Sequence, residues 1–306
     1  MEAFANQVVD LLNGLLWGKI LIWLLVGTGI YFTLRLGFIQ LRHFGHTFTV
    51  LRGSRRSDAS GISSFQALCT SLAARVGTGN IAGVAVAITL GGPGAIFWMW
   101  VIALVGMATG FAEATLAQLF KQRDDKGQFR GGPAYYMEKG LGQRWAGTMF
   151  SIFLIIAFGF AFNSVQSNTI AGAMVGAFEL DMGSFTLGGN EVAVAALVVG
   201  VAVTVLTAVI IFGGLRSIAR FSELAVPFMA VGYLVVAVGI LLVNLGEVPG
   251  VLAMIVKSAF GFHEAAAGGI GAAILNGFKR GLFSNEAGMG SAPNVAATAT
   301  VSHPVK

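Results

Sequence analysis

The chain has 306 residues, of which 56% are hydrophobic and only 11% are charged. A soluble globular domain carries about 25% charged residues, so the composition excludes an ordinary soluble domain and indicates a membrane protein. The net charge of +5 would suit nucleic-acid binding, but the basic residues alternate between loops, which is the pattern that sets membrane orientation. We therefore expect the partner to be a lipid bilayer and not a nucleic acid.

Seven apolar segments are long enough to cross a bilayer, which takes about 20 residues. They are roughly 16–38, 65–90, 95–119, 146–177, 191–213, 221–244 and 266–299. The first is too long for the apolar core of a cleavable signal peptide and follows no basic stretch, so it is interpreted as a true span. The fourth and seventh are longer than needed and are predicted to be tilted or broken. The predicted class is an all-α, polytopic membrane protein.

The basic residues predict how the spans are oriented. Most of them follow the first, third, fifth or seventh span, whereas Lys19 and Lys257 fall on the opposite side. The majority set is Arg35, Arg42, Arg52, Arg55, Arg56, Lys121, Arg123, Lys126, Arg130, Lys139, Arg144, Arg216, Arg220 and Lys306. By the positive-inside rule that side is cytoplasmic, which leaves the N-terminus outside. We expect a multi-pass protein of the inner (plasma) membrane.

A short motif occurs twice in the apolar segments. Arg75, Asn80 and Gly83 recur with the same spacing as Arg280, Asn285 and Gly288. The first copy lies in a segment that enters from the cytoplasm and the second in one that enters from outside, so the copies run antiparallel across the membrane. Paired, interrupted helices in such inverted repeats indicate the binding site of a secondary transporter.

The repeat also predicts the organisation of the chain. A broken first helix in each inverted repeat implies five helices per repeat, preceded here by one extra helix. Residues 1–64 would hold the extra helix and a basic cytoplasmic loop, residues 65–244 the first repeat, and residues 245–306 the start of the second. We expect about seven of eleven spans in this chain, and we expect that the chain alone does not transport.

The first copy of the motif contains Gly77-Thr78-Gly79, a poor helix sequence because each glycine costs about 1 kcal/mol relative to alanine. A helix that ends near Val76 would present free carbonyls, which suit a cation. A helix that starts near Asn80 would present free N–H groups, which suit a carboxylate. A zwitterionic amino acid beside a sodium ion fits both ends at once.

Asn80 stands where a helix N-cap is expected, so it either only caps the half-helix or also contacts the substrate. Its counterpart Asn285 has the same two interpretations. The second break is predicted at Phe283-Ser284, although that pair is less glycine-rich than the first break.

Three charged residues accompany the two breaks, and a fourth, Glu113, lies in the third span. Arg75 and Arg280 are predicted just before them, where a cation gains from the helix dipole and a structural role is expected. Glu286 follows at a helix start and either pairs with an arginine or titrates during transport. Glu113, near the inner end of the third span, is expected to pair locally.

The fourth span carries Asn163, Gln166 and Thr169 on one face. A polar stripe on a spanning helix either joins helices or lines a pathway. Gln166 donates and accepts hydrogen bonds, as amino-acid binding requires. Phe162 and Ile170 flank the stripe, where they would shape a small side-chain pocket.

The segment 131–137 in the cytoplasmic loop is too short to span. Pro133 suits the first turn of a helix, and two tyrosines follow it. Because tyrosines favour the membrane surface, an interfacial helix is predicted here.

Several separated motifs resemble the alanine or glycine:cation symporter family. They are Ser71–Gly83, Gly91–Trp100, Gly131–Tyr136 and Ser284–Pro293, and the resemblance runs from about Leu15 to the end of the chain. It implies a leucine-transporter-type inverted-repeat fold and sodium-coupled, occasionally proton-coupled, uptake of alanine or glycine. By the resemblance, Asn80 and Gln166 match substrate-binding positions. The carbonyls around Ala73 and Val76 match part of a sodium site whose other ligands lie on a helix absent here.

The predicted function is therefore a cation-coupled symporter that imports alanine or glycine by alternating access. Proton coupling is the alternative to sodium. A channel is a further alternative, but it would need a continuous polar path and the polar residues gather at the breaks. An enzyme is not expected, because the histidines His43, His46, His263 and His303 lie outside the central apolar runs.

The predicted site combines both breaks with the polar stripe. The predicted substrate contacts are Thr78, Gly79, Asn80, Asn163, Gln166, Phe283 and Ser284. The carbonyls of Ala73 and Val76 are the predicted partial sodium site. No cofactor is expected besides the coupling ion.

Overall fold

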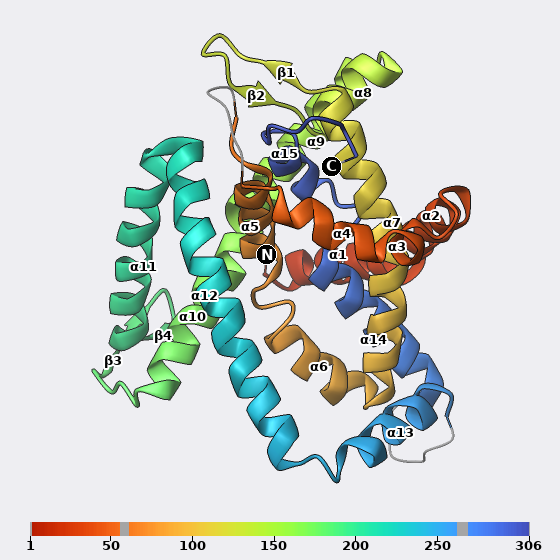
Figure 1. Ribbon diagram of the computed structural model, residues 1–306. Helices are drawn as coiled ribbons and strands as arrows, with labels where there is room; N and C mark the ends of the chain where they lie inside the picture. Colours follow the sequence, from red (N-terminus) through yellow and green to blue (C-terminus); the bar gives the residue numbers. More distant parts are fainter. Residues whose placement is uncertain (1, 56–60, 262–268, 306) are drawn as a thin grey trace.

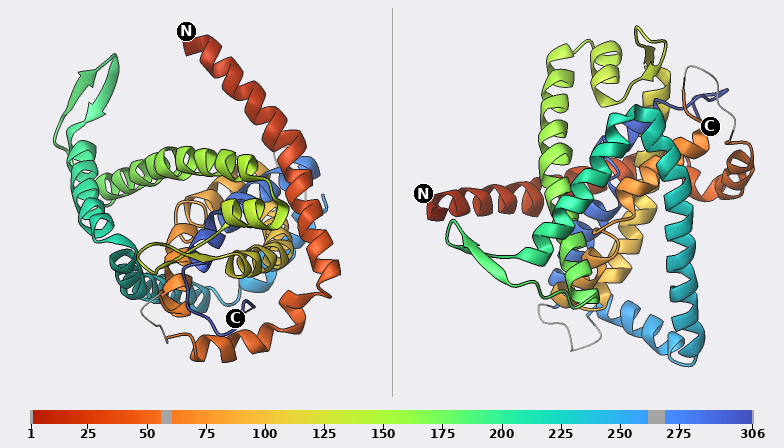
Figure 2. Two further views of the ribbon diagram at one scale, coloured as in Figure 1. Left: turned by 90° about the horizontal axis from the view of Figure 1, so that it is seen from above. Right: turned by 90° about the vertical axis from the view of Figure 1, so that its left-hand side faces the viewer.

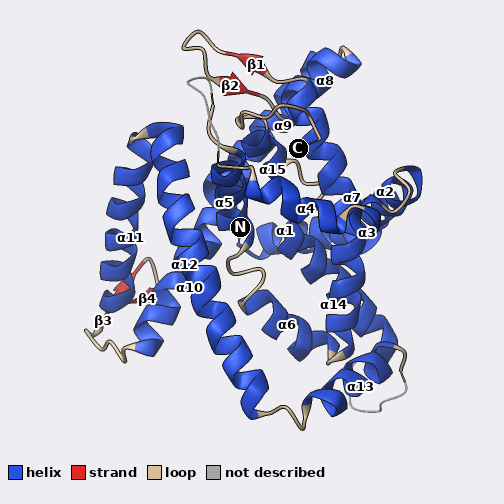
Figure 3. Ribbon diagram, viewed as in Figure 1, coloured by secondary structure: helices blue, strands red, loops and turns tan. Residues whose placement is uncertain are grey.

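The structure is a computed structural model that describes residues 2–55, 61–261 and 269–305 (Figure 1). Helices make up most of the described chain, together with two short hairpins of strands (Figure 3). The predicted helical class is confirmed. Arg56, His263, Lys306 and the first residues of the seventh predicted span lie outside the described residues.

Five helices in the described part of the chain are long and apolar enough to cross a membrane. They are Asn6–Arg35, Gly94–Leu119, Arg144–Ala177, Val194–Phe212 and Gly214–Val243. Seven spans were predicted. The structure has fewer because two of the predicted spans, 65–90 and 266–299, are each divided into shorter helices. Both of these segments carry the repeated motif, so interruption of the helix explains the difference.

The first span begins earlier than predicted. α1 (Glu2–Leu15), the π-helical η1 (Leu16–Ile20) and α2 (Leu21–Arg35) form one continuous helix, followed by α3 (Ile39–Arg42) and α4 (Phe44–Arg52). Figure 2 shows that the long helix runs across the direction of the other long helices. Most of its described side chains are exposed, so few packing contacts fix its direction.

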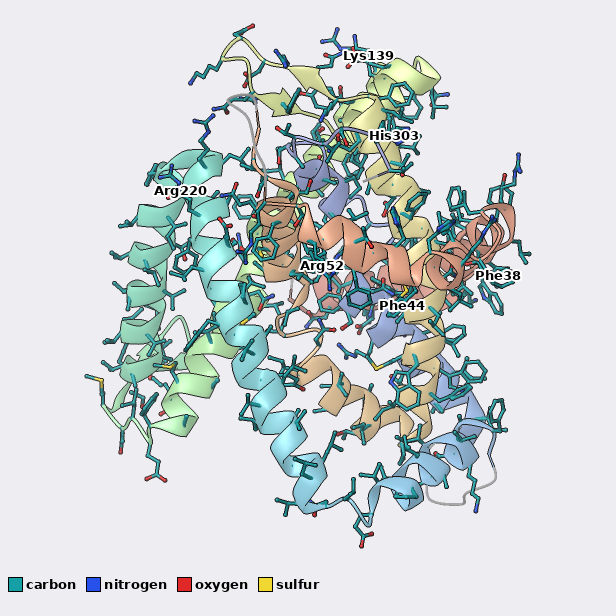
Figure 4. All side chains as sticks on the ribbon, in the orientation of Figure 1. Phe38, Phe44, Arg52, Lys139, Arg220 and His303 are labelled. Carbon is teal, nitrogen blue, oxygen red and sulfur yellow. The ribbon has the colours of Figure 1, made fainter. Side chains whose placement is uncertain are left out.

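The basic residues predicted to face the cytoplasm do not all lie at one end of the molecule. Lys139 and Arg220 lie toward one end with His303, whereas Arg52 lies near the middle of the same view (Figure 4). Lys257, predicted outside, belongs to α13 (Val248–Ala259) at the opposite end (Figure 1). The later helices agree with the predicted orientation and the N-terminal helices do not follow it, so orientation stays a prediction.

The second predicted span is interrupted at its glycines, as predicted. Its first half, α5 (Ser64–Arg75), begins with a capping box in which Ser63 and Gln66 exchange side-chain and backbone hydrogen bonds. Residues 76–81 are not helical, and the second half, α6 (Ala82–Gly91), follows them. We call residues 76–81 the first interruption.

The fourth predicted span bends through a π-helical turn and is not broken. α9 (Arg144–Leu154) continues through η2 (Ile155–Phe162) into α10 (Asn163–Ala177). A π-helical turn inside a long helix often accompanies a functional site, and this one ends at the predicted polar stripe.

An antiparallel hairpin connects this helix to the next two. β3 (Ser184–Leu187) pairs with β4 (Asn190–Ala193), and α11 (Val194–Phe212) and α12 (Gly214–Val243) follow. Because α12 starts before the predicted position 221, Arg216 and Arg220 lie inside a helix and not in a loop.

The loop after the third span contains a second hairpin and a short helix. β1 (Gln122–Arg123) pairs with β2 (Phe129–Arg130), and α8 (Pro133–Leu141) begins with proline as predicted. Asp124 accepts hydrogen bonds of 2.8 Å from the Gln128 N–H and the Arg130 Nε. These bonds hold the pKa of the Asp124 carboxyl below its usual value. The short helix is confirmed, and its place at a membrane surface stays a prediction.

Close helix packing places the second interrupted helix against α7 (Gly94–Leu119). α14 (Gly269–Asn285) packs along α7, because glycines leave room for close approach. A Cβ on Gly277 would lie 2.6 Å from both the Ala95 carbonyl oxygen and the Trp98 Cβ. The backbones therefore meet without an intervening side chain at this point.

The chain after the second interrupted helix pairs with the chain before the first. α15 (Ser291–Ala296) ends near Ile62, whose N–H donates to the Thr298 carbonyl over 3.2 Å and whose carbonyl accepts from the Thr300 N–H over 2.9 Å. Gln118 and Lys121, at the end of α7, both donate to the Ala299 carbonyl. One end of each interrupted helix is thereby held at the same face of the molecule.

We predict that Gly277→Ala destabilises the protein by about 1–3 kcal/mol, the usual cost of overpacking, because the added methyl would contact backbone atoms of α7. Gly271→Ala on the same helix is the matched control, since no atom lies within 4 Å of its Cβ position. The thermal unfolding midpoint of the purified protein checks this. Equal midpoints for the two variants would contradict the packing described here.

Candidate functional site

The two interrupted helices meet at residues 79–80 and 283–284. A Cβ on Gly79 would lie 3.3 Å from the Phe283 Cδ1 and 3.3 Å from the Ser284 Cα. The Ser284 hydroxyl donates a hydrogen bond to the Asn80 Oδ1. The fold therefore brings four predicted site residues together. Two of them, Asn80 and Ser284, are 204 positions apart in the sequence.

Asn80 shapes the first interruption, but not as the predicted N-cap. α6 begins at Ala82, and the residue that precedes it, Ile81, makes no side-chain cap. The Asn80 Nδ2 instead donates over 2.5 Å to the carbonyl of Arg75, the last residue of α5. The amide thus joins the end of the first half-helix to Ser284 on the other interrupted helix. The N-cap prediction is wrong because the non-helical backbone extends beyond the glycines.

Gln166 is the member of the polar stripe that reaches the first interruption. Its Oε1 lies 3.4 Å from the Thr78 backbone nitrogen, which donates to it, and its Nε2 lies 2.7 Å from where a Cβ on Gly77 would be. Asn163 is exposed and its Nδ2 donates to the Gly159 carbonyl of its own helix.

Thr169 likewise donates its hydroxyl within its own helix, to the Val165 carbonyl. An α-helix has 3.6 residues per turn, so residues spaced three apart point in progressively different directions around the helix axis. A stripe at positions 163, 166 and 169 therefore presents only its middle member to a given neighbour.

Three aromatic rings form a column beside the first interruption. Phe158 and Phe162 stack with centroids 4.4 Å apart, and Phe162 and Phe283 stack at 5.1 Å. Since Phe283 also contacts Gly79, the column covers the point where the interrupted helices meet. The prediction that Phe162 shapes the pocket agrees with this position.

The first interruption keeps backbone groups that no neighbour occupies. Within the described part of the chain, the N–H groups of Gly77 and Gly79 and the carbonyls of Ala73 and Val76 make no hydrogen bond. The α5 helix ends at Arg75, so its last carbonyls point beyond the helix. Unpaired N–H donors and unpaired carbonyl acceptors thus occur close together in the sequence, at residues 73–79.

The second interruption lies at residues 286–290 and not at the predicted Phe283-Ser284, which are still helical in α14. Glu286, Gly288 and Gly290 all have positive φ, at 54°, 86° and 77°. Arg280 consequently lies inside α14 and not at its end. The sequence indicated this break only through Gly288, the last residue of the repeated motif, and Gly290, which follows it.

The second interruption is filled by the protein's own polar side chains. The Asn285 Oδ1 accepts from the Ala287 N–H over 2.8 Å, and the Glu113 Oε2 accepts from the Gly288 N–H over 2.9 Å. Glu286 is 3% exposed and accepts from the Ser291 hydroxyl. The predicted Glu286–arginine pair is wrong, since the described residues contain no such ion pair. Glu113 contacts a distant segment and not the local partner expected.

A cavity of about 710 Å³ lies beside the aromatic column and is lined by Phe162 and Phe283 together with the N-terminal helix and α14. Lys279 and Arg280 lie on its wall, as do Asn13, Trp17 and Asn276. Thr78, Asn80 and Gln166 do not line it. This cavity is therefore distinct from the meeting point of the interrupted helices, although Phe283 borders both.

Comparison with known proteins places this geometry in context. A family model described as the sodium:alanine symporter family matches residues 1–306. The chain is 52% identical over 307 residues to a Bacillus subtilis protein named "Probable sodium/glutamine symporter GlnT", covering 100% of this chain and 61% of that protein.

Two further relatives give the same picture. The chain is 51% identical over 306 residues to "Amino-acid carrier protein AlsT" of Bacillus subtilis, with 100% of this chain and 62% of that protein covered. It is 43% identical over 305 residues to "Sodium/alanine symporter AgcS" of Methanococcus maripaludis, with 97% and 64% covered. The chain thus spans less than two thirds of the length of each of these relatives.

We predict that Ser284→Ala lowers stability by about 0.5–1.5 kcal/mol, the net value of one hydrogen bond, because the Asn80 amide loses its partner on α14. Ser164→Ala is the matched control, since its hydroxyl donates only to the Phe160 carbonyl of its own helix. Thermal unfolding of the two purified variants checks this. A larger loss in the control would contradict the structural role of the Ser284–Asn80 bond.

Proposed function

The chain belongs to the sodium:alanine symporter family, and on that premise we propose that its two interrupted helices form part of a sodium-coupled importer of alanine or glycine. The family consists of transporters and not enzymes. The single observation that carries the proposal is the first interruption, which leaves backbone donors and acceptors unpaired beside Asn80 and Gln166.

The substrate carboxylate is proposed to bind the unpaired N–H groups of Gly77 and Gly79 and to displace the Gln166 amide from the Thr78 N–H. A carboxylate there would replace hydrogen bonds that the helix no longer supplies, which is why interrupted helices recur at transporter binding sites. Gln166 would bind the substrate's polar groups with its amide, while Asn80 and Ser284 would hold the two helices in register. The predicted contact from Asn163 requires its side chain to leave the Gly159 carbonyl.

The coupling ion is proposed to bind the carbonyls of Ala73 and Val76. These oxygens lie at the C-terminal end of α5, where the helix dipole favours a cation. Only part of an ion site is supplied by these two groups, because a sodium ion needs further oxygen ligands. Proton coupling is the alternative, and it would leave the two carbonyls to water or to protein donors.

The fold of the full transporter is proposed to be the leucine-transporter-type inverted repeat. Two observations support it: both copies of the motif lie at interrupted helices, and residues 79–80 of one face residues 283–284 of the other. The proposed first repeat is 65–244 and the second begins at 245. The proposed location is the inner membrane with the N-terminus outside.

Alternating access is the proposed mechanism. Ion binding at the α5 carbonyls would stabilise the first interruption in the shape that accepts the carboxylate. A ligand shifts the equilibrium between outward and inward states only through its different affinity for the two. The first interruption would provide that difference, since its unpaired backbone groups would bind the ligand in one state and not in the other.

Alanine, glycine and glutamine are the amino acids to compare as substrates. Glutamine appears in the name of one relative and alanine in that of another. The aromatic column of Phe158, Phe162 and Phe283 beside Gly79 favours a small side chain, because the rings already fill the space next to the interruption.

We predict that proteoliposomes with the full-length gene product that contains these residues accumulate labelled alanine when an inward sodium gradient is present. Without the gradient only equilibration is expected. Accumulation driven by a pH gradient without sodium would replace sodium by a proton in this scheme. Stronger competition by unlabelled glutamine than by glycine or alanine would overturn the assignment of a small substrate.

We predict that Asn80→Ala weakens alanine binding by about 5- to 150-fold, which corresponds to roughly 1–3 kcal/mol for a disrupted polar site, without preventing membrane insertion. Asn168→Ala is the control, because it removes the same side chain from an exposed position on α10. Equilibrium binding of labelled alanine is the measurement. Equal affinities in the two variants would remove Asn80 from the site.

A further inference from the structure

We propose that Glu223 on α12 is a positioning residue that holds the start of α5 and so fixes the half-helix that ends at the first interruption. The Glu223 Oε2 accepts a hydrogen bond of 2.8 Å from the Gln66 Nε2, across 157 positions of sequence. We call this hydrogen bond the latch. It rests on the proposed function only where it concerns transport, and the latch itself is tested without sodium or alanine.

The side-chain amide of Gln66 is used at both of its ends. Its Oε1 accepts from the Ser63 N–H over 3.1 Å, in the capping box that begins α5. That bond fixes the direction of the amide and leaves the Nε2 to bond to another helix. A glutamate at this position would form the same capping box. A glutamine adds what a glutamate lacks, an N–H donor for a carboxylate on α12.

Glu223 needs such a donor. It is half-buried, and it forms no ion pair among the described residues. A carboxylate that loses water on burial is stabilised only if hydrogen-bond donors replace the water. Hydrogen bonds to an ionised acceptor are also stronger than those between neutral groups. The Gln66 amide therefore makes a strong single contact between the two helices.

The buried residues beneath the latch are mostly small. α5 packs along α12 (Figure 1), where Ala67 and Ala219 lie in a buried cluster with Ile62 and Ala299. Alanine buries little apolar area, and hydrophobic stabilisation follows the area removed from water. In the part of the chain that the structure describes, no other hydrogen bond or ion pair joins α5 to α12. The latch is thus the specific contact that holds or releases the start of α5.

A displacement of α5 at the latch moves the other end of the helix. α5 is one helix of 12 residues, so Gln66 and Val76 lie about 15 Å apart along a rigid element, at 1.5 Å per residue. The proposed ion-binding carbonyls of Ala73 and Val76 lie at this far end. Because the first interruption separates α5 from α6, α5 can tilt without carrying α6 with it. The latch therefore sets the position of the carbonyls on which the coupling ion is proposed to depend.

The test uses Cys69 as a reporter of the contact between α5 and α12. Cys69 follows Gln66 on α5 and is 2% exposed, so its labelling requires local opening around this helix. The full-length gene product is treated with N-ethylmaleimide in the absence of sodium and alanine. The peptide that contains Cys69 is quantified by mass spectrometry, which separates it from any other cysteine of the full-length product.

Gln66→Glu breaks the latch and keeps the capping box. The new carboxylate accepts from the Ser63 N–H as before, but it faces Glu223 with a like charge. We expect Cys69 to be labelled about tenfold faster, the lower end of the factor for loss of one hydrogen bond to a charged group. Electrostatics alone would give the opposite result, because a carboxylate near a thiol disfavours the reactive thiolate. Faster labelling is therefore specific to opening.

The double variant that combines Gln66→Glu with Glu223→Gln exchanges the two groups of the latch. The amide on α12 then donates to the carboxylate on α5, so labelling is expected to return to within about threefold of the unchanged protein. Gln143→Glu is the matched control. It makes the same change at an exposed position before α9 and is expected to leave the labelling rate unchanged.

A second measurement keeps the test decisive if Gln66→Glu does not fold. Glu223→Ala removes the acceptor from α12 and leaves α5 and its capping box unchanged. Amide hydrogen exchange over residues 64–72 is expected to become faster in this variant, because opening of the helix contact exposes the backbone. This readout does not depend on the chemistry of the thiol, and unchanged exchange would contradict the latch.

Transport gives a separate readout. In a transporting protein, Gln66→Glu is expected to lower the rate of alanine uptake about tenfold and the double variant to restore it, because the carbonyls at the end of α5 lose and regain their position. Unchanged uptake together with faster labelling would overturn the role of the latch in transport.

The labelling results decide the latch itself. An unchanged labelling rate in a folded Gln66→Glu protein would overturn it. Labelling of the double variant as fast as that of Gln66→Glu would overturn the pairing of the two side chains. Absence of alanine uptake in the unchanged protein would count against the proposed function and leave the labelling result standing.

Discussion

The constraint on which the structure depends is that backbone N–H and carbonyl groups in an apolar environment need partners. Two helices of this chain are interrupted, and each interruption frees such groups. The structure resolves the two cases differently. The second interruption is satisfied by Asn285 and Glu113, whereas the N–H groups of Gly77 and Gly79 in the first have no partner among the described residues. An interruption that the protein itself satisfies is structural, and one that it leaves open is suited to a ligand.

Close helix packing brings the two interruptions together. α14 approaches α7 at Gly277 with no side chain between the backbones, which places Glu113 of α7 within reach of Gly288. The same helix carries Ser284 to Asn80. Glycine thus has two separate roles in this chain, because it weakens the helix at residues 77 and 79 and allows backbone contact at residue 277.

The candidate site and the cavity of about 710 Å³ are distinct, and Phe283 borders both. Phe162 and Phe283 stack on each other and line this cavity, whose wall also carries Lys279 and Arg280, whereas Asn80 does not line it. The rings limit the space next to Gly79, and this packing feature is the basis of the proposal that the site takes a small ligand.

The sequence by itself determined the membrane class, the family, the span at 95–119 and the interruption at Gly77-Thr78-Gly79, because composition, apolar length and glycine are local properties. It predicted Gln166 beside the site, but it also predicted an N-cap for Asn80 and a break at Phe283-Ser284, and both were wrong. Only the tertiary structure decided that Asn80 bonds to Arg75 and Ser284, that Gln166 and not Asn163 reaches the first interruption, and that the second break follows Asn285. The physical reason is that a polar group's partner comes from another helix, and helical periodicity gives the face of a residue but not what lies opposite it.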